Sequence, residues 1–157
     1  MSVHRLDREQ LVPRELPVVF EFFSRAGNLE RITPPWLSFG LITPEPIEMR
    51  SGTLIEYRLR VHGVPVRWVS RIEEWEENRL FVDRQLRGPY GLWHHRHEFT
   101  AVPGGTRVRD HVEYALPFGI LGDLVHLALV RRDLTRIFDY RNEAVTRLLK
   151  SPGPRPS

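Results

Sequence analysis

Between Leu37 and Leu116 apolar and polar residues alternate with a period close to two, which is the spacing of β-strands. After Pro117 the apolar residues follow the period of an α-helix as far as Lys150. A chain of 157 residues makes one compact domain. The long helix must therefore cover the apolar face of the sheet that the strands form. The sequence predicts one α+β domain over residues 1–150, with a cavity between a curved sheet and this helix.

Turn residues interrupt the alternation at regular intervals, so that six strands are expected in this region. Their ranges are Leu37–Thr43, Thr53–His62, Val64–Trp75, Leu80–Arg87, Leu92–Val102 and Thr106–Leu116. A further strand, Val3–Val12, precedes them. Pro17 suits the first turn of a helix over Leu16–Arg25. Asn28 is expected to cap a second short helix, which ends at Thr33-Pro34-Pro35.

The C-terminal helix is expected to be irregular near Gly119 and Gly122. Arg131 and Arg141 fall on or beside its apolar stripe. Either could lean into the cavity mouth and meet a carboxylate or a phosphate, or could extend to the rim. His126, on the same segment, is expected to be packed or half-exposed. The proline-rich tail, residues 151–157, has no apolar side chain and is expected to be disordered.

Side-chain parity assigns one face of each strand to the cavity. The inward residues form a wall in which aromatic side chains surround a polar centre. The aromatic residues are Tyr57, Trp68, Trp93, Phe99 and Tyr114, and the polar residues are Asp83, Gln85, His95, His97 and Asp110. An unpaired polar group in a closed interior costs about 1–3 kcal/mol. The five polar residues must therefore pair with one another, with water or with a ligand.

Turns at Gly104-Gly105, Pro89 and His62-Gly63 predict the register between neighbouring strands. The pairs expected to face each other are Phe99 and Asp110, His97 and Val112, His95 and Tyr114, Asp83 and His95, Phe81 and His97, Gln85 and Trp93, and Tyr57 and Trp68. This register predicts a carboxylate–imidazole pair between Asp83 and His95.

The polar centre has several interpretations. It could be a self-satisfied network that fixes strand register, or the oriented polar part of a small-molecule pocket, where few polar groups lie among many aromatic ones. Asp83 and His95 could also act as an oriented general base, although no nucleophile stands out. His95 and His97 with a carboxylate could ligate zinc. Because two histidines at this spacing are common by chance in a chain with seven, no metal and no cofactor is predicted.

Composition excludes several classes of protein. The chain has no cysteine, so it has neither disulfides nor thiolate chemistry. It has no run of eighteen apolar residues, and its N-terminus lacks the apolar segment of a secretory signal, so a cytoplasmic protein without a membrane span is expected. The net charge is +3, and arginines are interspersed with carboxylates, so nucleic-acid binding is not expected. Transient membrane contact and a protein partner stay open.

Several short segments resemble the START-like, or SRPBCC, superfamily. They are Asn28-Leu29-Glu30, Thr33 to Leu37, Phe81 to Gln85, Gly88-Pro89-Tyr90, Trp93 to Phe99, Asp110 to Tyr114 and Leu116 to Gly119. They are most similar to a bacterial subgroup related to a domain fused to an epimerase-like protein. The resemblance implies the helix-grip fold, in which a seven-stranded antiparallel sheet wraps around a long C-terminal helix, with two short helices after the first strand. Relatives bind lipids, sterols, quinones or polyketides, and a few cyclise or dehydrate them.

The expected function is the binding, or transport, of a hydrophobic, ring-containing small molecule in this cavity. One alternative is a polyketide cyclase or dehydratase that uses Asp83 and His95 as the base and Tyr57 or Tyr114 as the proton donor. A second alternative is a protein-partner module, which predicts a filled interior and an exposed apolar patch.

Overall fold

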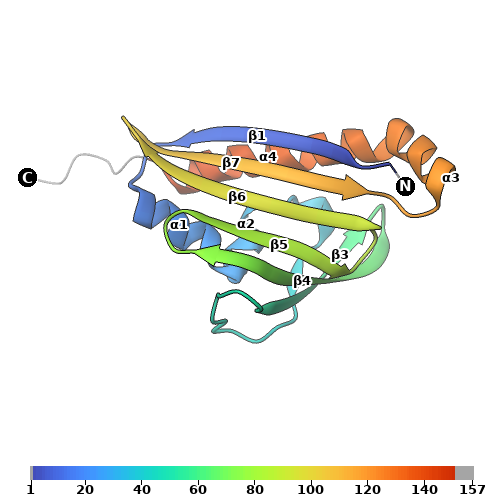
Figure 1. Cartoon of the computed structure of the whole chain (residues 1–157), viewed down its shortest axis with the longest axis horizontal. Coiled ribbons are helices and arrows are strands. Elements are labelled where there is room, and N and C mark those ends of the chain that lie inside the picture. The colour runs from blue at the N-terminus through green and yellow to red at the C-terminus, as the bar shows by residue number, and fades with distance from the viewer. Residues whose placement is uncertain (1, 151–157) are drawn as a thin grey trace, which may run out of the picture.

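A computed structural model describes residues 2–150. Seven antiparallel strands form one sheet in the order β1-β7-β6-β5-β4-β3-β2 (Figure 1). The strands are β1 (His4–Val12), β2 (Gly40–Leu41), β3 (Leu54–Val61), β4 (Val64–Glu76), β5 (Leu80–Arg87), β6 (Leu92–Val102) and β7 (Gly105–Ala115). This is the helix-grip architecture expected from the sequence. The tail predicted to be disordered lies outside the described residues.

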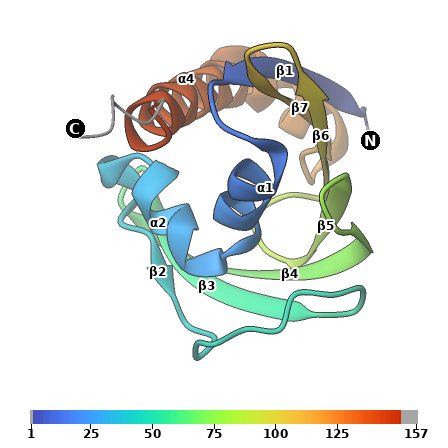
Figure 2. The ribbon, with the colours of Figure 1, turned by 90° about the vertical axis from the view of Figure 1, so that its left-hand side faces the viewer.

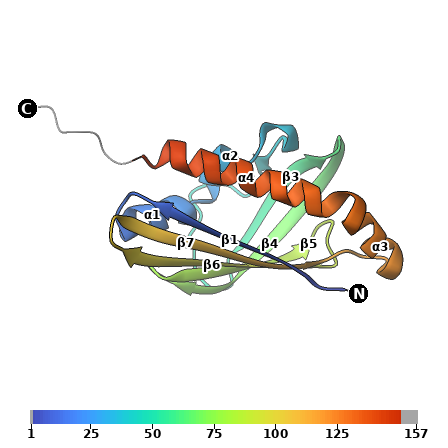
Figure 3. The same ribbon diagram turned by 90° about the horizontal axis from the view of Figure 1, so that it is seen from above.

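The helices lie on the concave side of the sheet. They are α1 (Leu16–Ser24), the 3₁₀ turns Ala26–Asn28 and Pro35–Leu37, α2 (Leu29–Ile32), α3 (Gly119–Val125), the π-helix His126–Val130 and α4 (Arg131–Leu148). In Figure 2 the sheet curls around α1, and α4 closes the open side. Figure 3 shows α4 crossing the sheet, with α3 at the end of the molecule away from α1. No helix of residues 2–150 is both long and apolar enough to span a bilayer.

Two local predictions before β3 are wrong. The expected strand Leu37–Thr43 is shortened to Gly40–Leu41, although the N–H groups of Ile42 and Thr43 still donate to the Glu56 carbonyl of β3. Pro34 and Pro35 bring no backbone donors, and the chain instead makes a 3₁₀ turn that ends with Ser38 in the left-handed region at φ 47°. Asn28 makes no side-chain cap on α2, because its backbone is already helical at φ −75° and ψ −16°, and its side-chain amide donates to the Phe22 carbonyl at 2.8 Å.

The register between β6 and β7 is shifted by two residues from the predicted one. The turn is Pro103-Gly104, not Gly104-Gly105, and Gly104 takes the positive φ of 89° that this turn requires. Gly105 starts β7, where a Cβ would lie only 2.0 Å from the carbonyl oxygen of Val12. His97 therefore faces Asp110, and the other pairs predicted across β6 and β7 are wrong in the same way. An even shift leaves every side chain on its predicted face.

The other predicted registers are confirmed in part. Asp83 faces His95 and Phe81 faces His97, while Tyr57 faces Trp68. The described β5–β6 ladder ends one residue before Gln85, so the pair between Gln85 and Trp93 is not formed.

Two apolar clusters flank the middle of the sheet. One gathers around α1 and includes Phe20, Phe81 and Phe99. The other lies under the N-terminal half of α4 and includes Trp68, Trp93, Val112, Tyr114, Leu134 and Phe138. The irregular part of the C-terminal helix is the π-helix His126–Val130, a few residues beyond the glycines from which irregularity was expected. The polar centre of the sheet lies between the two clusters.

Candidate functional site

A cavity of about 680 Å³ lies between the sheet and α4, where the cavity of the helix-grip fold is expected. Its wall is mainly apolar and aromatic, with a polar corner formed by Asp83, His95, His97 and Arg141. Six of the residues predicted to bind a ligand line it, namely Tyr57, Trp68, Asp83, Trp93, His95 and His97. Ligand contact by these residues stays a prediction.

Four predicted site residues lie outside the cavity lining. The Gln85 side chain bonds both backbone groups of Tyr90, with its amide at 2.8 Å from the carbonyl and its oxygen at 3.1 Å from the N–H. Phe99 packs in the cluster around α1. The Tyr114 hydroxyl lies 2.7 Å from Nε2 of His126. Asp110 is buried behind the two histidines.

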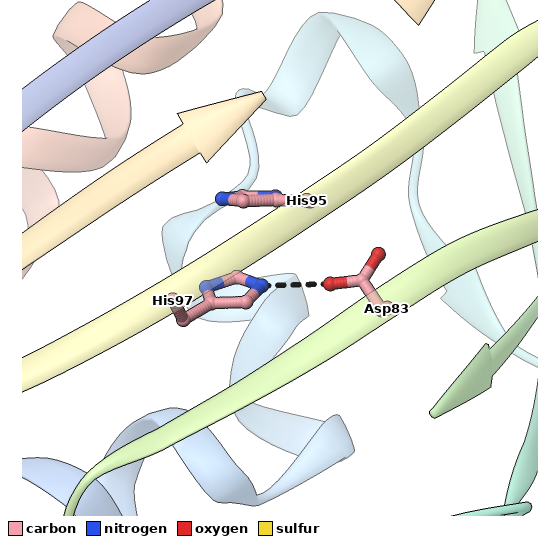
Figure 4. Close-up of side chains that lie close together, drawn as sticks. All are labelled: Asp83, His95 and His97. Carbon is pink, nitrogen blue, oxygen red and sulfur yellow. Dashed lines mark hydrogen bonds and ion pairs between the residues drawn. The ribbon is translucent and has the colours of Figure 1, made fainter. Parts of the chain in front are cut away.

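The polar corner is a continuous hydrogen-bonded network, but its partners differ from the predicted ones. Nε2 of His97 lies 2.7 Å from Oδ2 of Asp83 (Figure 4), and Nε2 of His95 lies 2.7 Å from Oδ1 of Asp110. Nδ1 of His97 is a further 3.3 Å from Asp110. The predicted bond between Asp83 and His95 is wrong. The two imidazole rings stack at 3.7 Å. His95 faces Val112 on β7 but contacts Asp110, two residues along that strand, and His97 faces Phe81 on β5 but contacts Asp83, again two residues along.

Both carboxyls of the network are held ionised. Burial opposes the ionisation of Asp110, but Arg141 and the hydrogen bonds from the two histidines outweigh it and hold the pKa well below its usual range. Burial likewise opposes the ionisation of Asp83, and the hydrogen bond and charge of His97 lower the pKa of this carboxyl instead.

The two imidazoles bind a proton with different strength. Burial favours the neutral form of His97, but hydrogen bonds with Asp110 and Asp83 on its two nitrogens raise its pKa. Burial, followed by the neighbouring charge of His97, lowers the pKa of His95 to about 4. His97 therefore holds a proton more strongly than a free imidazole does, and His95 is the neutral ring. When His97 is protonated, its charge and that of the Arg141 guanidinium balance the two carboxylates.

The neutral state of His95 fixes its tautomer. An ionised carboxylate only accepts hydrogen bonds, so Nε2 of His95 carries the proton that it donates to Asp110. Its Nδ1 is left with a free lone pair. Within residues 2–150 this atom has no hydrogen-bond partner, and it is not fully buried. Because His95 lines the cavity, Nδ1 is an acceptor that a bound molecule can reach.

Arg141 enters the network, which is one of the two outcomes weighed from the sequence. Its side chain is 12% exposed, and its Nη2 lies 3.5 Å from Oδ1 of Asp110. The guanidinium also lies over the rings of Phe23 and Phe138, at 5.4 and 5.7 Å from their centroids. Arg131 stays exposed outside the main cavity.

Trp36 and Ser70 are cavity residues that sequence reasoning did not place in the site. Trp36 belongs to the Thr33–Leu37 segment that carried the family resemblance, and this segment was the only available signal for it. Ser70 was noted as inward-facing, and its hydroxyl accepts a 2.9 Å hydrogen bond from the Trp68 indole.

Asp83, His95 and His97 place potential metal-ligand atoms within 4.8 Å of one another. Both nitrogens of His97 face carboxylates, and the stacked rings are inclined by only 23°. Lone pairs in nearly parallel ring planes do not converge on a single ion. The arrangement therefore favours the hydrogen-bonded network over a metal centre.

The sequence matches the model of the family described as polyketide cyclase/dehydrase and lipid transport over residues 12–137. The chain belongs to this polyketide cyclase/dehydrase and lipid-transport family. Among curated proteins, no significant sequence match is found. The family membership agrees with the resemblance drawn from the sequence motifs, and it supports hydrophobic ligand binding or cyclisation in general terms.

Solved structures share the fold of this family member at low sequence identity. An aromatase/cyclase from Streptomyces sp. R1128 is 14% identical with a TM-score of 0.67, covering 98% of this chain and 100% of that one. Ara h 8.0201 is 16% identical with a TM-score of 0.64, covering 93% and 99%. A nucleoside-diphosphate sugar epimerase from Corynebacterium glutamicum is 23% identical with a TM-score of 0.69. The match spans 92% of this chain but only 29% of the epimerase chain.

Proposed function

We propose that this family member binds a hydrophobic, ring-containing small molecule that carries a hydroxyl group. The observation that carries the proposal is the free Nδ1 lone pair of His95 in a cavity of about 680 Å³ with aromatic walls. Pockets of a few hundred Å³ with few polar groups are typical small-molecule sites. Burial of apolar surface supplies most of the affinity, at roughly 25 cal/mol per Å² before the costs of binding.

The polar corner favours a ligand that donates hydrogen bonds. His95 offers Nδ1, and Asp83 offers Oδ1, because its Oδ2 already accepts from His97. Both atoms are acceptors, so a phenolic or enolic hydroxyl complements them, whereas a ligand carboxylate would meet the charge of Asp83. The aromatic side chains of Tyr57, Trp68 and Trp93 suit the face of a ring.

A first experiment is native mass spectrometry of gently purified protein, followed by identification of any small molecule that it carries. Calorimetric titration with 2-naphthol, 2-methoxynaphthalene and 2-naphthoate then tests the hydroxyl preference. We expect the naphthol to bind at least about tenfold more tightly than either analogue, since hydrogen bonds to charged groups are worth about 1.5–3 kcal/mol. Equal affinities for the three probes would contradict the hydroxyl preference.

A cavity-filling variant locates the binding. Ile137 lines the cavity, and Ile137→Trp should abolish naphthol binding by occupying its space. Leu86→Trp is the control, because Leu86 is exposed on β5 and outside the cavity lining. If neither variant changes binding while both stay folded, the ligand site lies elsewhere.

The geometry also favours a second function, a cyclase or dehydratase. Asp110 orients His95 so that its unprotonated Nδ1 faces the cavity, which is the arrangement of a general base beside a carbonyl substrate. Tyr57 lines the same cavity, and burial raises the pKa of its hydroxyl, so it stays protonated and can donate to the carbonyl oxygen. Tyr114, the other donor suggested by the sequence, bonds His126 instead.

Deuterium exchange at the α-carbon of 1-tetralone tests this base by NMR. Nδ1 of His95 would take the proton from carbon, leaving the enolate, and would return a deuteron after exchange with D₂O. His95→Gln keeps a donor for Asp110 but loses the basic lone pair, so it should abolish exchange, while 2-naphthol still binds, more weakly, to the apolar wall and Asp83. Exchange that continues in this variant would remove His95 as the base and leave the binding function standing.

A further inference from the structure

The segment from Phe118 to Leu129 exposes several large apolar side chains. Six large apolar residues on it are exposed and form what we call the α3 face, namely Phe118, Ile120, Leu121, Leu124, Val125 and Leu129. Phe118 and Ile120 are each 82% exposed. Single exposed apolar residues are common on proteins, but a contiguous group of this kind marks an interaction surface.

The inward side of this segment is made of Gly122 and His126, both of which are buried. A Cβ on Gly122 would lie 2.2 Å from the Pro117 carbonyl oxygen, so only glycine allows this close contact. The imidazole of His126 lies 2.7 Å from the Tyr114 hydroxyl and stacks on His4 at 3.5 Å. These contacts fix the rotation of the helix, and Leu121, Leu124 and Val125 must then point away from the protein.

The charges next to the α3 face indicate what covers it. Arg131 and Arg132 follow it directly, both are exposed, and neither has an ion-pair partner within residues 2–150. The one acidic residue of the segment, Asp123, is engaged by the Ser2 hydroxyl at 2.9 Å. Apolar side chains beside unpaired arginines are the composition of helices that lie in the interface of an anionic bilayer.

A second copy of the chain fits this surface less well. Most homodimers form by a two-fold contact that places the same surface of each copy against the other. Such a contact over the α3 face would bring the two Arg131-Arg132 pairs close together, while the nearby carboxylates of Asp123 and Asp133 already contact Ser2 and His62. Lipid phosphates supply the opposite charge, and the arginine stems can extend to the headgroups while the apolar side chains enter the acyl region.

We infer that the α3 face docks this protein on the surface of an anionic lipid bilayer. The docking site adjoins the cavity, because Leu116 and Val130, which flank the segment on its two sides, line the cavity. A membrane-dissolved apolar molecule would therefore meet the protein at the end of its cavity. The docking itself does not depend on what the cavity binds.

Flotation with vesicles of roughly two parts phosphatidylcholine to one part phosphatidylglycerol tests the inference on the full chain. We expect the protein to float with these vesicles and Leu121→Asp/Leu124→Asp to bind at least about tenfold more weakly. Leu11→Asp/Leu54→Asp is the matched control, because it also adds two carboxylates at exposed leucines, on β1 and β3. It should float like the unaltered chain.

The contribution of the arginines is measured with Arg131→Gln/Arg132→Gln. This variant should lose about fivefold in affinity per charge on the anionic vesicles, and nothing on phosphatidylcholine alone. Failure of the unaltered chain to float, or equal loss in the Leu11/Leu54 control, would overturn the inference. It would also be overturned if the aspartate variant converted a dimer to a monomer in sedimentation without changing flotation. Naphthol binding is measured without vesicles, so either proposal can fail alone.

Discussion

The protein stacks two histidines face to face in two places, and the surroundings of the two pairs differ. His95 and His97 stack at 3.7 Å under α4, where carboxylates and a guanidinium engage all their nitrogens except the one that faces the cavity. His4 and His126 stack at 3.5 Å beside α3, where one nitrogen of each ring is buried without a partner. The first pair is surrounded by charged groups at hydrogen-bond distance, whereas the second has one carboxylate nearby, Oδ1 of Asp123 at 3.8 Å from Nε2 of His4. The comparison indicates that the carboxylates, rather than the stacking, decide what each pair contributes.

The largest effect is expected from Asp110→Asn. The change leaves the Arg141 guanidinium and His97 with Asp83 as their one remaining carboxylate in a buried site, and breaking such a buried pair costs about 3–5 kcal/mol of unfolding free energy. Asp7→Asn is the control, because Asp7 also lies 2.7 Å from a histidine nitrogen, that of His111, but at an exposed position. The control should cost less than about 1 kcal/mol in urea unfolding at neutral pH. Equal losses would show that burial of the network is unimportant.

The pH dependence of the unfolding free energy tests whether His95 is neutral in the folded protein. The pKa of His95 is about 4 in the folded protein and near 6.5 in the unfolded chain, so the unfolded chain binds more protons between these values. Stability should therefore fall on acidification from about pH 6.5 to 4, by of the order of 3 kcal/mol from this residue. Urea unfolding across this range should show a smaller loss in His95→Gln.

The other histidines provide controls for this measurement. Burial and the neighbouring His4 lower the pKa of His126, so it adds loss in the same direction, and His126→Gln should remove that part. The pKa of His97 is raised, so its contribution is complete below about pH 6.5 and is lost as pH rises through its folded pKa. An unchanged acid slope in both glutamine variants would mean that neither imidazole is neutral in the folded protein.

The helices over the two pairs should respond differently to truncation. Leu134 of α4 is 4% exposed and faces the sheet, whereas Leu124 of α3 is 58% exposed. Leu134→Ala should cost about 2 kcal/mol, at the lower end for a buried leucine because the side chain already borders the cavity. Leu124→Ala should cost less than about 0.5 kcal/mol. Thermal unfolding of the two variants measures the difference, and a similar cost for both would place Leu124 in the core.

Among the changes to buried side chains, the smallest effect is expected from His126→Leu/Tyr114→Phe. The double variant removes both partners of one buried hydrogen bond together with the unpartnered Nδ1 of His126. Replacing both partners by apolar groups of similar shape is nearly neutral, so urea unfolding should change by less than about 1 kcal/mol. A loss as large as that of Asp110→Asn would show that the second pair is also part of an essential network.

The sequence predicted the architecture because strand and helix periods are local properties of the chain. Alternation placed Tyr57, Trp68 and His95 on the inner face, and the motifs of β5 to β7 indicated the family that the chain matches. The expected strand near Leu37 failed because proline and a left-handed Ser38 redirected the chain. The cap expected at Asn28 failed because this residue already belongs to the preceding 3₁₀ turn and has helical backbone angles.

Tertiary structure alone decided which groups meet. The turn between β6 and β7 moved by one residue, which shifted the register by two and left every face unchanged, so no alternation pattern could reveal it. That shift placed Asp110 beside both histidines and allowed Arg141, from a helix distant in sequence, to complete the network. In the same way, the contact of Gly122 with Pro117 turned the apolar residues of α3 outward. The sequence period shows that a helix has an apolar face, but only packing against the rest of the chain decides where that face points.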